Sequence, residues 1–178
     1  MNPHTANRVI GLDCESNGLH GQIFAIGISV QTRDSGETFA AQWRCPILGL
    51  VDPWVAEHVL PILDHPLMGI REDSSLTESD LGAQWREVYD PLKDEGYQVV
   101  THIAWPVEAR FLWSAHMADP FSGPFPLRDV AGNLEQAGYD PESLDSYLTA
   151  TASERYGRPH HPVYDARSAV HAYFQLTA

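Results

Sequence analysis

Two acidic residues near the start of the chain, Asp13 and Glu15, have a spacing that suits metal-ion chemistry. They end a segment in which Ile10, Leu12 and Cys14 alternate with them, so the pattern predicts a β-strand with both carboxylates on one face. Residues two apart on a strand lie about 6.5 to 7 Å apart along it. Two carboxylates so placed can share a pair of cations. The pair alone is more typical of a solvated strand end in an acidic chain.

A second group of reactive residues lies near the other end of the chain, in the segment HHPVYDAR. A histidine that titrates near neutral pH can take a proton from water, and either His160 or His161 can be that histidine. Asp165 adds a carboxylate, the oxygen ligand that Mg²⁺ and Mn²⁺ prefer. In isolation, a His-His pair before a proline is more typical of a surface loop or a helix cap.

The two segments together resemble one known family. The run D-C-E-S-N-G-L from Asp13 to Leu19 is similar to the D-x-E-T-T-G-L opening of the DEDDh-type 3'-to-5' exonucleases. These belong to the ribonuclease H-like superfamily and include proofreading exonucleases, oligoribonuclease and small bacterial exoribonucleases. The late segment fits the family's H-x4-D-A, with His160 in register with Asp165 and His161 out of register. The motif order also agrees, so the resemblance covers nearly the whole chain.

The resemblance implies a two-metal hydrolytic site. Its metal ligands would be Asp13, Glu15, Glu108 and Asp165, holding two divalent cations, Mg²⁺ or Mn²⁺. His160 would be the general base, which completes the expected catalytic set. Hard cations with oxygen ligands can activate a water and stabilise the charge that develops on a phosphate.

Glu108 is the point at which the chain departs from the family. An aspartate is expected about three residues before an aromatic-aliphatic pair, and this chain has Glu108 before Phe111 and Leu112. The glutamate is one methylene longer, and the usual upstream asparagine is missing. The alternative is that Glu108 only favours the start of a helix through the helix dipole, which would leave the site impaired.

The same resemblance predicts the substrate-binding residues. Ser16, Asn17 and Gly18 would approach the 3'-terminal nucleotide through their backbone, and Leu19 would pack against its base. Glycine permits such a close approach. Arg155 and Arg158 precede His160 and can contact phosphate, although solvated surface arginines are equally expected. The segment WVAEHVLP at residues 54–61 is similar to a helix of small bacterial exoribonucleases, and its spacing indicates amphipathic packing.

The elements that must position these residues are those of an α/β protein. Three strands forming a β-meander are predicted at residues 7–14, 22–31 and 37–44, and a buried strand at 97–102. Residues 71–80 are expected to form a surface loop. Helices are expected to begin at Asp52-Pro53, near Ser79 or Asp80, at Pro106, at Asp129, at Pro141 and near Pro162, with Pro91 bending or shortening the second of them. The expected fold class is a mixed β-sheet, an antiparallel meander plus parallel strands, flanked by helices, and ribonuclease H-like by resemblance.

Length and composition set limits on the function. The 178 residues are predicted to form one exonuclease domain, 1–178. The net charge of −13 argues against a protein that grips long nucleic acid through a broad basic face, but not against a nuclease. Two cysteines make no disulfide framework, and no apolar run suits a signal peptide or a membrane span, so a cytoplasmic protein without a membrane partner is expected.

The expected function is therefore a metal-dependent 3'-to-5' exonuclease that releases nucleoside 5'-monophosphates from a single-stranded 3' end. RNA or short oligonucleotides are slightly favoured over DNA, because the acidic chain disfavours long DNA and the similarity of residues 54–61 to a helix of small bacterial exoribonucleases favours RNA. Two alternatives stay open: an impaired module that binds nucleic-acid ends or a protein partner, and a metal-binding protein without hydrolytic activity. The number of subunits is also open, with a homodimer as one alternative.

Overall fold

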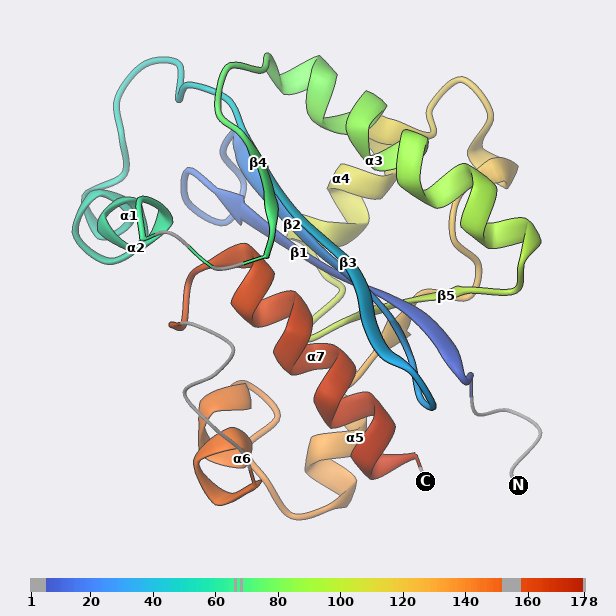
Figure 1. Cartoon of the computed structure of the whole chain (residues 1–178). Helices are drawn as coiled ribbons and strands as arrows, with labels where there is room; N and C mark the ends of the chain where they lie inside the picture. The colour runs from blue at the N-terminus through green and yellow to red at the C-terminus, as the bar shows by residue number, and fades with distance from the viewer. Residues whose placement is uncertain (1–5, 66, 68, 152–157, 178) are drawn as a thin grey trace.

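A six-stranded mixed sheet forms the centre of the computed structural model, which describes residues 6–65, 67, 69–151 and 158–177. The strand order is β4-β3-β2-β1-β5-β6 (Figure 1). Strands β1 to β3 are an antiparallel meander, whereas β4, β5 and β6 each pair in parallel with a neighbour. Their bounds are β1 Arg8–Ser16, β2 Ile23–Thr32, β3 Gly36–Arg44, β4 Arg71–Asp73, β5 Gln98–Thr101 and β6 Arg128–Asp129. The predicted α/β mixed sheet is confirmed.

Helices cover both faces of this sheet (Figure 1). Helices α3 and α4 pack on one face, and α5, α6 and α7 share a second core on the other. Helices α1 and α2 lie at one end of the sheet, beside the start of α7 (Figure 1). The bounds are α1 Pro53–His58, α2 Leu60–Leu63, α3 Glu78–Asp94, α4 Val107–Ala115, α5 Ala131–Gln136, α6 Leu144–Thr151 and α7 Pro162–Leu176, with a short 3₁₀ helix at Pro120–Ser122.

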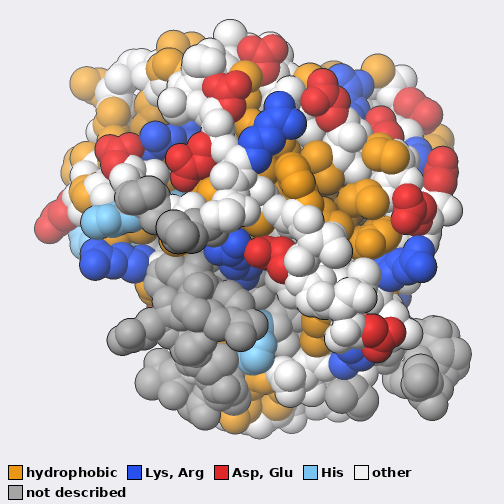
Figure 2. Space-filling view, in the orientation of Figure 1, with side chains coloured by type: hydrophobic (Ala, Val, Ile, Leu, Met, Phe, Trp, Pro, Cys, Tyr) orange, Lys and Arg blue, Asp and Glu red, His pale blue; other side chains and the backbone are white. Residues whose placement is uncertain are grey.

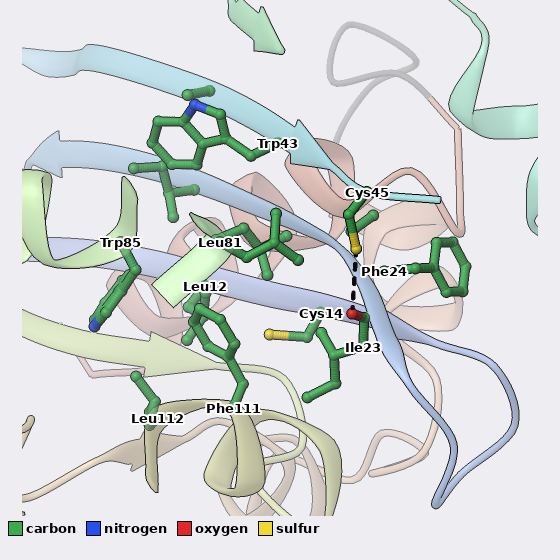
Figure 3. Packing of buried hydrophobic residues seen from close by; sticks show 14 of the residues in the cluster. Leu12, Cys14, Ile23, Phe24, Trp43, Cys45, Leu81, Trp85, Phe111 and Leu112 are labelled. Atoms are coloured by element: carbon green, nitrogen blue, oxygen red, sulfur yellow. Dashed lines mark hydrogen bonds between the residues drawn. The ribbon is translucent and has the colours of Figure 1, made fainter. Parts of the chain in front are cut away.

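The face of β1 that was predicted to be apolar packs against α3 and α4. Ile10, Leu12 and Cys14 lie in one buried cluster with Leu81 and Trp85 of α3 (Figure 3). The next residue back, Val9, belongs to the core on the opposite face. The predicted alternation along β1 is therefore confirmed, and it directs Asp13 and Glu15 toward the α7 side.

Both cysteines are free and buried in the first cluster. The Cys45 thiol donates a hydrogen bond to the Ile23 carbonyl at 3.8 Å (Figure 3). Burial raises the thiol pKa of Cys14, and nearby carboxylates raise it further, which keeps this thiol protonated.

Two glycines allow α7 to lie directly on the sheet. A Cβ atom added at Gly11 would come within 2.4 Å of the Ala166 carbonyl oxygen, and one at Gly27 within 2.2 Å of the Pro162 carbonyl carbon. No side chain fits at such distances, so only glycine permits this approach. Gly27 pairs with Asp13 across the β1–β2 ladder, which places the start of α7 beside that carboxylate.

Some local predictions were wrong. Residues 71–73, predicted as part of a loop, form β4, because an edge strand pairs through its backbone and needs no apolar side chains. Pro91 does not shorten α3, which continues to Asp94, because buried side chains earlier in the helix hold it and only one backbone donor is lost at the proline. Helices α5 and α6 begin later than predicted, at Ala131 and Leu144.

On the face shown in Figure 2, Lys and Arg side chains are scattered among Asp and Glu and form no broad basic surface. Hydrophobic side chains gather on this face between α3 and the strands (Figure 2). Within the described ranges, none of the helices combines the length and the apolar character needed to cross a bilayer.

Candidate active site

The acidic residues of the two motifs meet where β1 ends and α7 begins. Asp13, Glu15, His160 and Asp165 all line one cleft of about 350 Å³. Ligand atoms of Glu15, His160 and Asp165 lie within 4.8 Å of one another. Residues from opposite ends of the chain are thus brought together as the sequence predicts.

Glu108 reaches this region from the first turn of α4. Its Oε1 accepts a hydrogen bond from the Cys14 backbone N–H at 3.2 Å, across 94 residues of sequence. The side chain is buried and does not line the cleft, whose lining includes Asp13 and Glu15 but not Glu108. Glu108 therefore lies against the strand that carries both acids, outside the compact group that Glu15 forms with His160 and Asp165.

Burial raises the pKa of all four carboxyl groups. That of Asp13 rises to about 7 through desolvation. That of Glu108 rises to about 8, first through desolvation and then through repulsion by Asp13. Those of Glu15 and Asp165 lie well above the usual range, again through desolvation first and the neighbouring acids second. Closely spaced carboxylates without a compensating cation are costly, and oxygen donors of this kind fit Mg²⁺ or Mn²⁺.

His160 faces this acidic group from the turn before α7. Its backbone is left-handed, with φ at 64°, and its N–H donates to Asp165 Oδ2 at 2.9 Å. Although the residue is exposed, the cleft walls desolvate its ring, and this lowers the pKa of His160; Asp145 opposes the shift and His58 adds to it. The ring is therefore neutral near neutral pH and able to accept a proton.

His161 occupies a different environment, the N-cap position of α7. It is only 1% exposed, and neither ring nitrogen has a hydrogen-bond partner among the described residues. Burial lowers its pKa to about 4, with Arg167 the next cause. Of the two adjacent histidines, His160 is the one that lines the cleft.

The predicted substrate-binding residues form the turn between β1 and β2. The Asn17 N–H already donates to the Gln22 carbonyl at 2.8 Å, and the Ser16 hydroxyl donates to the Gly18 carbonyl at 2.9 Å. Gly18 has a positive φ of 72°, and Leu19 is 60% exposed. Leu19 is thus available to a ligand, whereas the backbone N–H of Asn17 is used within the protein.

Asn17 has a role that its sequence position did not reveal. Its Oδ1 accepts a hydrogen bond from the Asp52 N–H at 2.7 Å, and its Nδ2 donates to the Leu50 carbonyl at 2.9 Å. Asp52 caps α1, as predicted, by accepting from the N–H groups of Trp54 and Val55. The β1–β2 turn is therefore attached to α1.

Sequence reasoning missed several residues of the cleft. Its lining also includes His102 and Asp145, and Asp145 accepts a hydrogen bond from the Tyr164 hydroxyl at 3.2 Å. The only signal was that Tyr164 immediately precedes Asp165 in the late motif. Of the two arginines considered for phosphate, Arg155 lies outside the described residues and Arg158 contacts His65 at 3.4 Å.

Asp129, predicted as a helix cap, performs a capping role. Its carboxylate accepts from the Ala131 N–H at 2.9 Å, at the start of α5, and from the Ala104 N–H at 2.8 Å. It therefore ties the segment after β5 to the segment after β6, and it does not line the cleft.

Comparisons with protein-family models and with curated proteins found no match for this chain.

Proposed function

We propose that this protein is a two-metal-ion 3'-to-5' exonuclease that removes nucleoside 5'-monophosphates from a single-stranded 3' end. One observation carries the proposal: Asp13, Glu15 and Asp165 line the same cleft as His160. A hydrolytic site of this class needs oxygen ligands for cations beside a neutral base, and this cleft contains both. The resemblance of the two motifs to DEDDh exonucleases also supports it, and the mixed sheet flanked by helices is compatible with a ribonuclease H-like fold.

The carboxylates define where cations would bind. Asp13, Glu15 and Asp165 would hold Mg²⁺ or Mn²⁺ directly, with Glu108 as the fourth acid beside β1, where it accepts the Cys14 N–H. Such cations, when bound, stabilise negative charge on the phosphate and favour ionisation of the attacking water. The raised pKa values of the four acids support this, because each carboxyl group loses its proton more easily beside a cation.

His160 would act as the general base. A ring nitrogen takes a proton from the attacking water, and the water oxygen forms a bond to phosphorus. The bond from phosphorus to the 3' oxygen of the preceding nucleotide breaks, and that oxygen takes up a proton from solvent water, while His160 releases its proton to solvent. The products are a nucleoside 5'-monophosphate and a chain that is one nucleotide shorter and ends in a 3' hydroxyl.

The electrostatic character of the protein favours a short substrate. With a net charge of −13, the protein repels a long polyanion. A short RNA or a single-stranded overhang needs only a few phosphate contacts near the cleft. Short single-stranded oligonucleotides are therefore proposed as the better substrates. RNA is favoured over single-stranded DNA only by the similarity of residues 54–61 to a helix of small bacterial exoribonucleases.

A time-resolved cleavage assay tests this proposal. RNA and DNA of equal sequence, each labelled at the 5' end, are incubated with Mg²⁺, Mn²⁺ or EDTA. We expect a ladder that shortens from the 3' end with either cation and no cleavage in EDTA. Asp165→Asn should abolish the ladder, whereas Asp34→Asn, at the exposed β2–β3 turn, should leave it unchanged. Tight binding of the oligonucleotide without cleavage would instead indicate an end-binding module.

A further inference from the structure

The indole ring of Trp54 contacts His160 directly. The two ring centroids lie 5.1 Å apart in an edge-on arrangement, with an angle of 88° between the ring planes. His58 stacks on Trp54, with centroids 4.9 Å apart. Trp54 is nevertheless 51% exposed, so it is not a core residue. Helix α1 buries Val55 as its pattern predicts, but Trp54 lies against the ring of His160, a residue that lines the cleft, instead of packing inside.

Within the described residues, the His160 ring makes no hydrogen bond, so packing contacts must hold its side chain. Its left-handed backbone is uncommon for a residue with a side chain and persists where the surroundings enforce it. The bond from its N–H to Asp165 fixes the backbone but leaves rotation about the side-chain bonds free. Among the contacts of the described residues, the indole of Trp54 is the aromatic surface that restricts the imidazole.

Trp54 itself is held by a chain of contacts that leads back to β1. The backbone N–H of Trp54 donates to Asp52 Oδ1 at 2.9 Å, and the backbone N–H of Asp52 donates to Asn17 Oδ1 at 2.7 Å. Asn17 follows directly on the strand that carries Asp13 and Glu15. The strand with two acids and the turn with the histidine are thus linked through α1.

We propose that Trp54 is a positioning residue for His160, held in place by Asn17 through Asp52. This inference rests on the proposed function, because it assigns Trp54 a role through the general base. In this role Trp54 fixes the imidazole at the angle from which a ring nitrogen faces the attacking water. A displacement of about 1 Å at a reacting group can cost about 100-fold in rate.

The competing role for an exposed indole at this cleft is stacking on a nucleotide base. The two roles differ in kinetics. A stacking residue contributes to substrate binding, so its loss raises KM whether or not His160 is present. A positioning residue acts only through His160, so its loss lowers kcat and has no effect once His160 has been removed.

NMR spectroscopy tests the contact without reference to activity. In protein labelled with ¹³C-histidine, the ring-proton signals of His160, assigned with His160→Ala, should shift in Trp54→Ala because the ring current of the indole is lost. Glu57→Ala, at an exposed position of the same helix, should leave these signals unchanged. Unchanged His160 signals in Trp54→Ala would overturn the proposal.

Steady-state kinetics on a short single-stranded RNA with Mn²⁺ test the role. Trp54→Ala should lower kcat about 10- to 100-fold with little change in KM, and Trp54→Phe should recover most of the rate. Asn17→Ala should show a smaller loss of the same kind. In the His160→Ala background, Trp54→Ala should cause no further loss.

The outcomes separate the two claims. If the wild type does not cleave RNA, or if His160→Ala keeps full activity, the proposed function fails and the inference fails with it. If His160→Ala impairs cleavage but Trp54→Ala raises KM alone, or lowers activity further in the His160→Ala background, the function stands and the positioning role is overturned. Because Trp54 is half exposed, Trp54→Ala should fold, and Trp54→Phe gives a second fold-preserving comparison.

Discussion

Replacing Glu108 by glutamine should stabilise the metal-free protein and impair the proposed nuclease activity at the same time. The carboxyl group lies buried against β1, and repulsion by Asp13 adds to the cost of its charge. Glutamine removes the charge but keeps an oxygen that can accept the hydrogen bond from the Cys14 N–H. A variant with this opposite pair of effects identifies a residue whose charge serves binding at the expense of folding.

The magnitude follows from the pKa of Glu108. Folding raises it from 4.5 to about 8, so the stability that the group contributes is full below about pH 4.5 and is lost as the pH rises toward about pH 8. At about pH 7 the loss is at most about 3 kcal/mol, at about 1.36 kcal/mol for each pH unit. Glu108→Gln should recover up to that amount, which raises Tm by at most about 6 to 12 °C for a chain of this length.

Thermal unfolding in EDTA between about pH 5 and pH 8 measures this effect. The gain in unfolding free energy of Glu108→Gln over the wild type should be below about 1 kcal/mol at about pH 5 and grow as the pH rises. Adding Mn²⁺ should narrow the difference in Tm between Glu108→Gln and the wild type, because the cation stabilises the wild type more. Cleavage by Glu108→Gln should need more Mn²⁺ and be slower, whereas Glu108→Asp, which keeps the charge but is shorter, should retain measurable activity.

Glu135→Gln, an exposed glutamate of α5, is the matched control and should change neither Tm nor rate. The reasoning is refuted if Glu108→Gln is less stable than the wild type at neutral pH and cleaves with an unchanged metal dependence. That result is expected if Glu108 only interacts with the helix dipole, in which case Glu108→Gln should lose about 0.3 to 1 kcal/mol of unfolding free energy.

Three further predictions concern the cleft and His161 beside it. Asp13→Ala and Asp165→Ala should each abolish cleavage while the protein stays folded, because each removes a cation ligand. Circular dichroism and the cleavage assay check this, and full activity in either variant would refute the assignment of that residue as a cation ligand. His160→Ala should lose about 10² to 10⁴-fold in rate at nearly unchanged stability. His161→Ala should lose about 1 to 3 kcal/mol of unfolding free energy, because a buried ring is removed, and should affect the rate less. Denaturant unfolding and initial rates compare the two variants, and a larger rate loss in His161→Ala would contradict the assignment of His160 as the base. Mn²⁺ should raise Tm more at about pH 8 than at about pH 5, because the raised pKa values of Asp13 and Asp165 mean that their charge costs stability only at higher pH. Scanning calorimetry measures the shift in Tm, and an equal shift at both pH values would contradict this prediction.

The parts of the fold that depend on local pattern were predictable. The alternation of Ile10, Leu12 and Cys14 determined which face of β1 is buried, and therefore the direction of Asp13. The Asp52-Pro53 pair predicted the start of α1 because a cap requires only neighbouring residues. Strands β4 and β6 were not predictable, since each is short and pairs through its backbone alone.

The parts of the site that depend on distant contacts could not be read from local pattern. The hydrogen bond from Cys14 to Glu108 and the contact of Trp54 with His160 each join residues that no periodicity relates. Asp145 lines the cleft because α6 packs beside α7, a consequence of tertiary structure. The two motifs predicted which acids and which histidine would meet, but not the side chains that surround them.

Product analysis by mass spectrometry, after cleavage in ¹⁸O-labelled water, tests the central claim most directly. A short single-stranded RNA is incubated with the wild type and Mn²⁺, and both the nucleotides and the shortened chains are identified. We predict nucleoside 5'-monophosphates that carry ¹⁸O on phosphorus, released in order from the 3' end, and none from Asp165→Asn. Internal fragments, 3'-phosphate ends, or an intact RNA that binds without being cleaved would contradict the assignment of this cleft as the active site of a 3'-to-5' exonuclease.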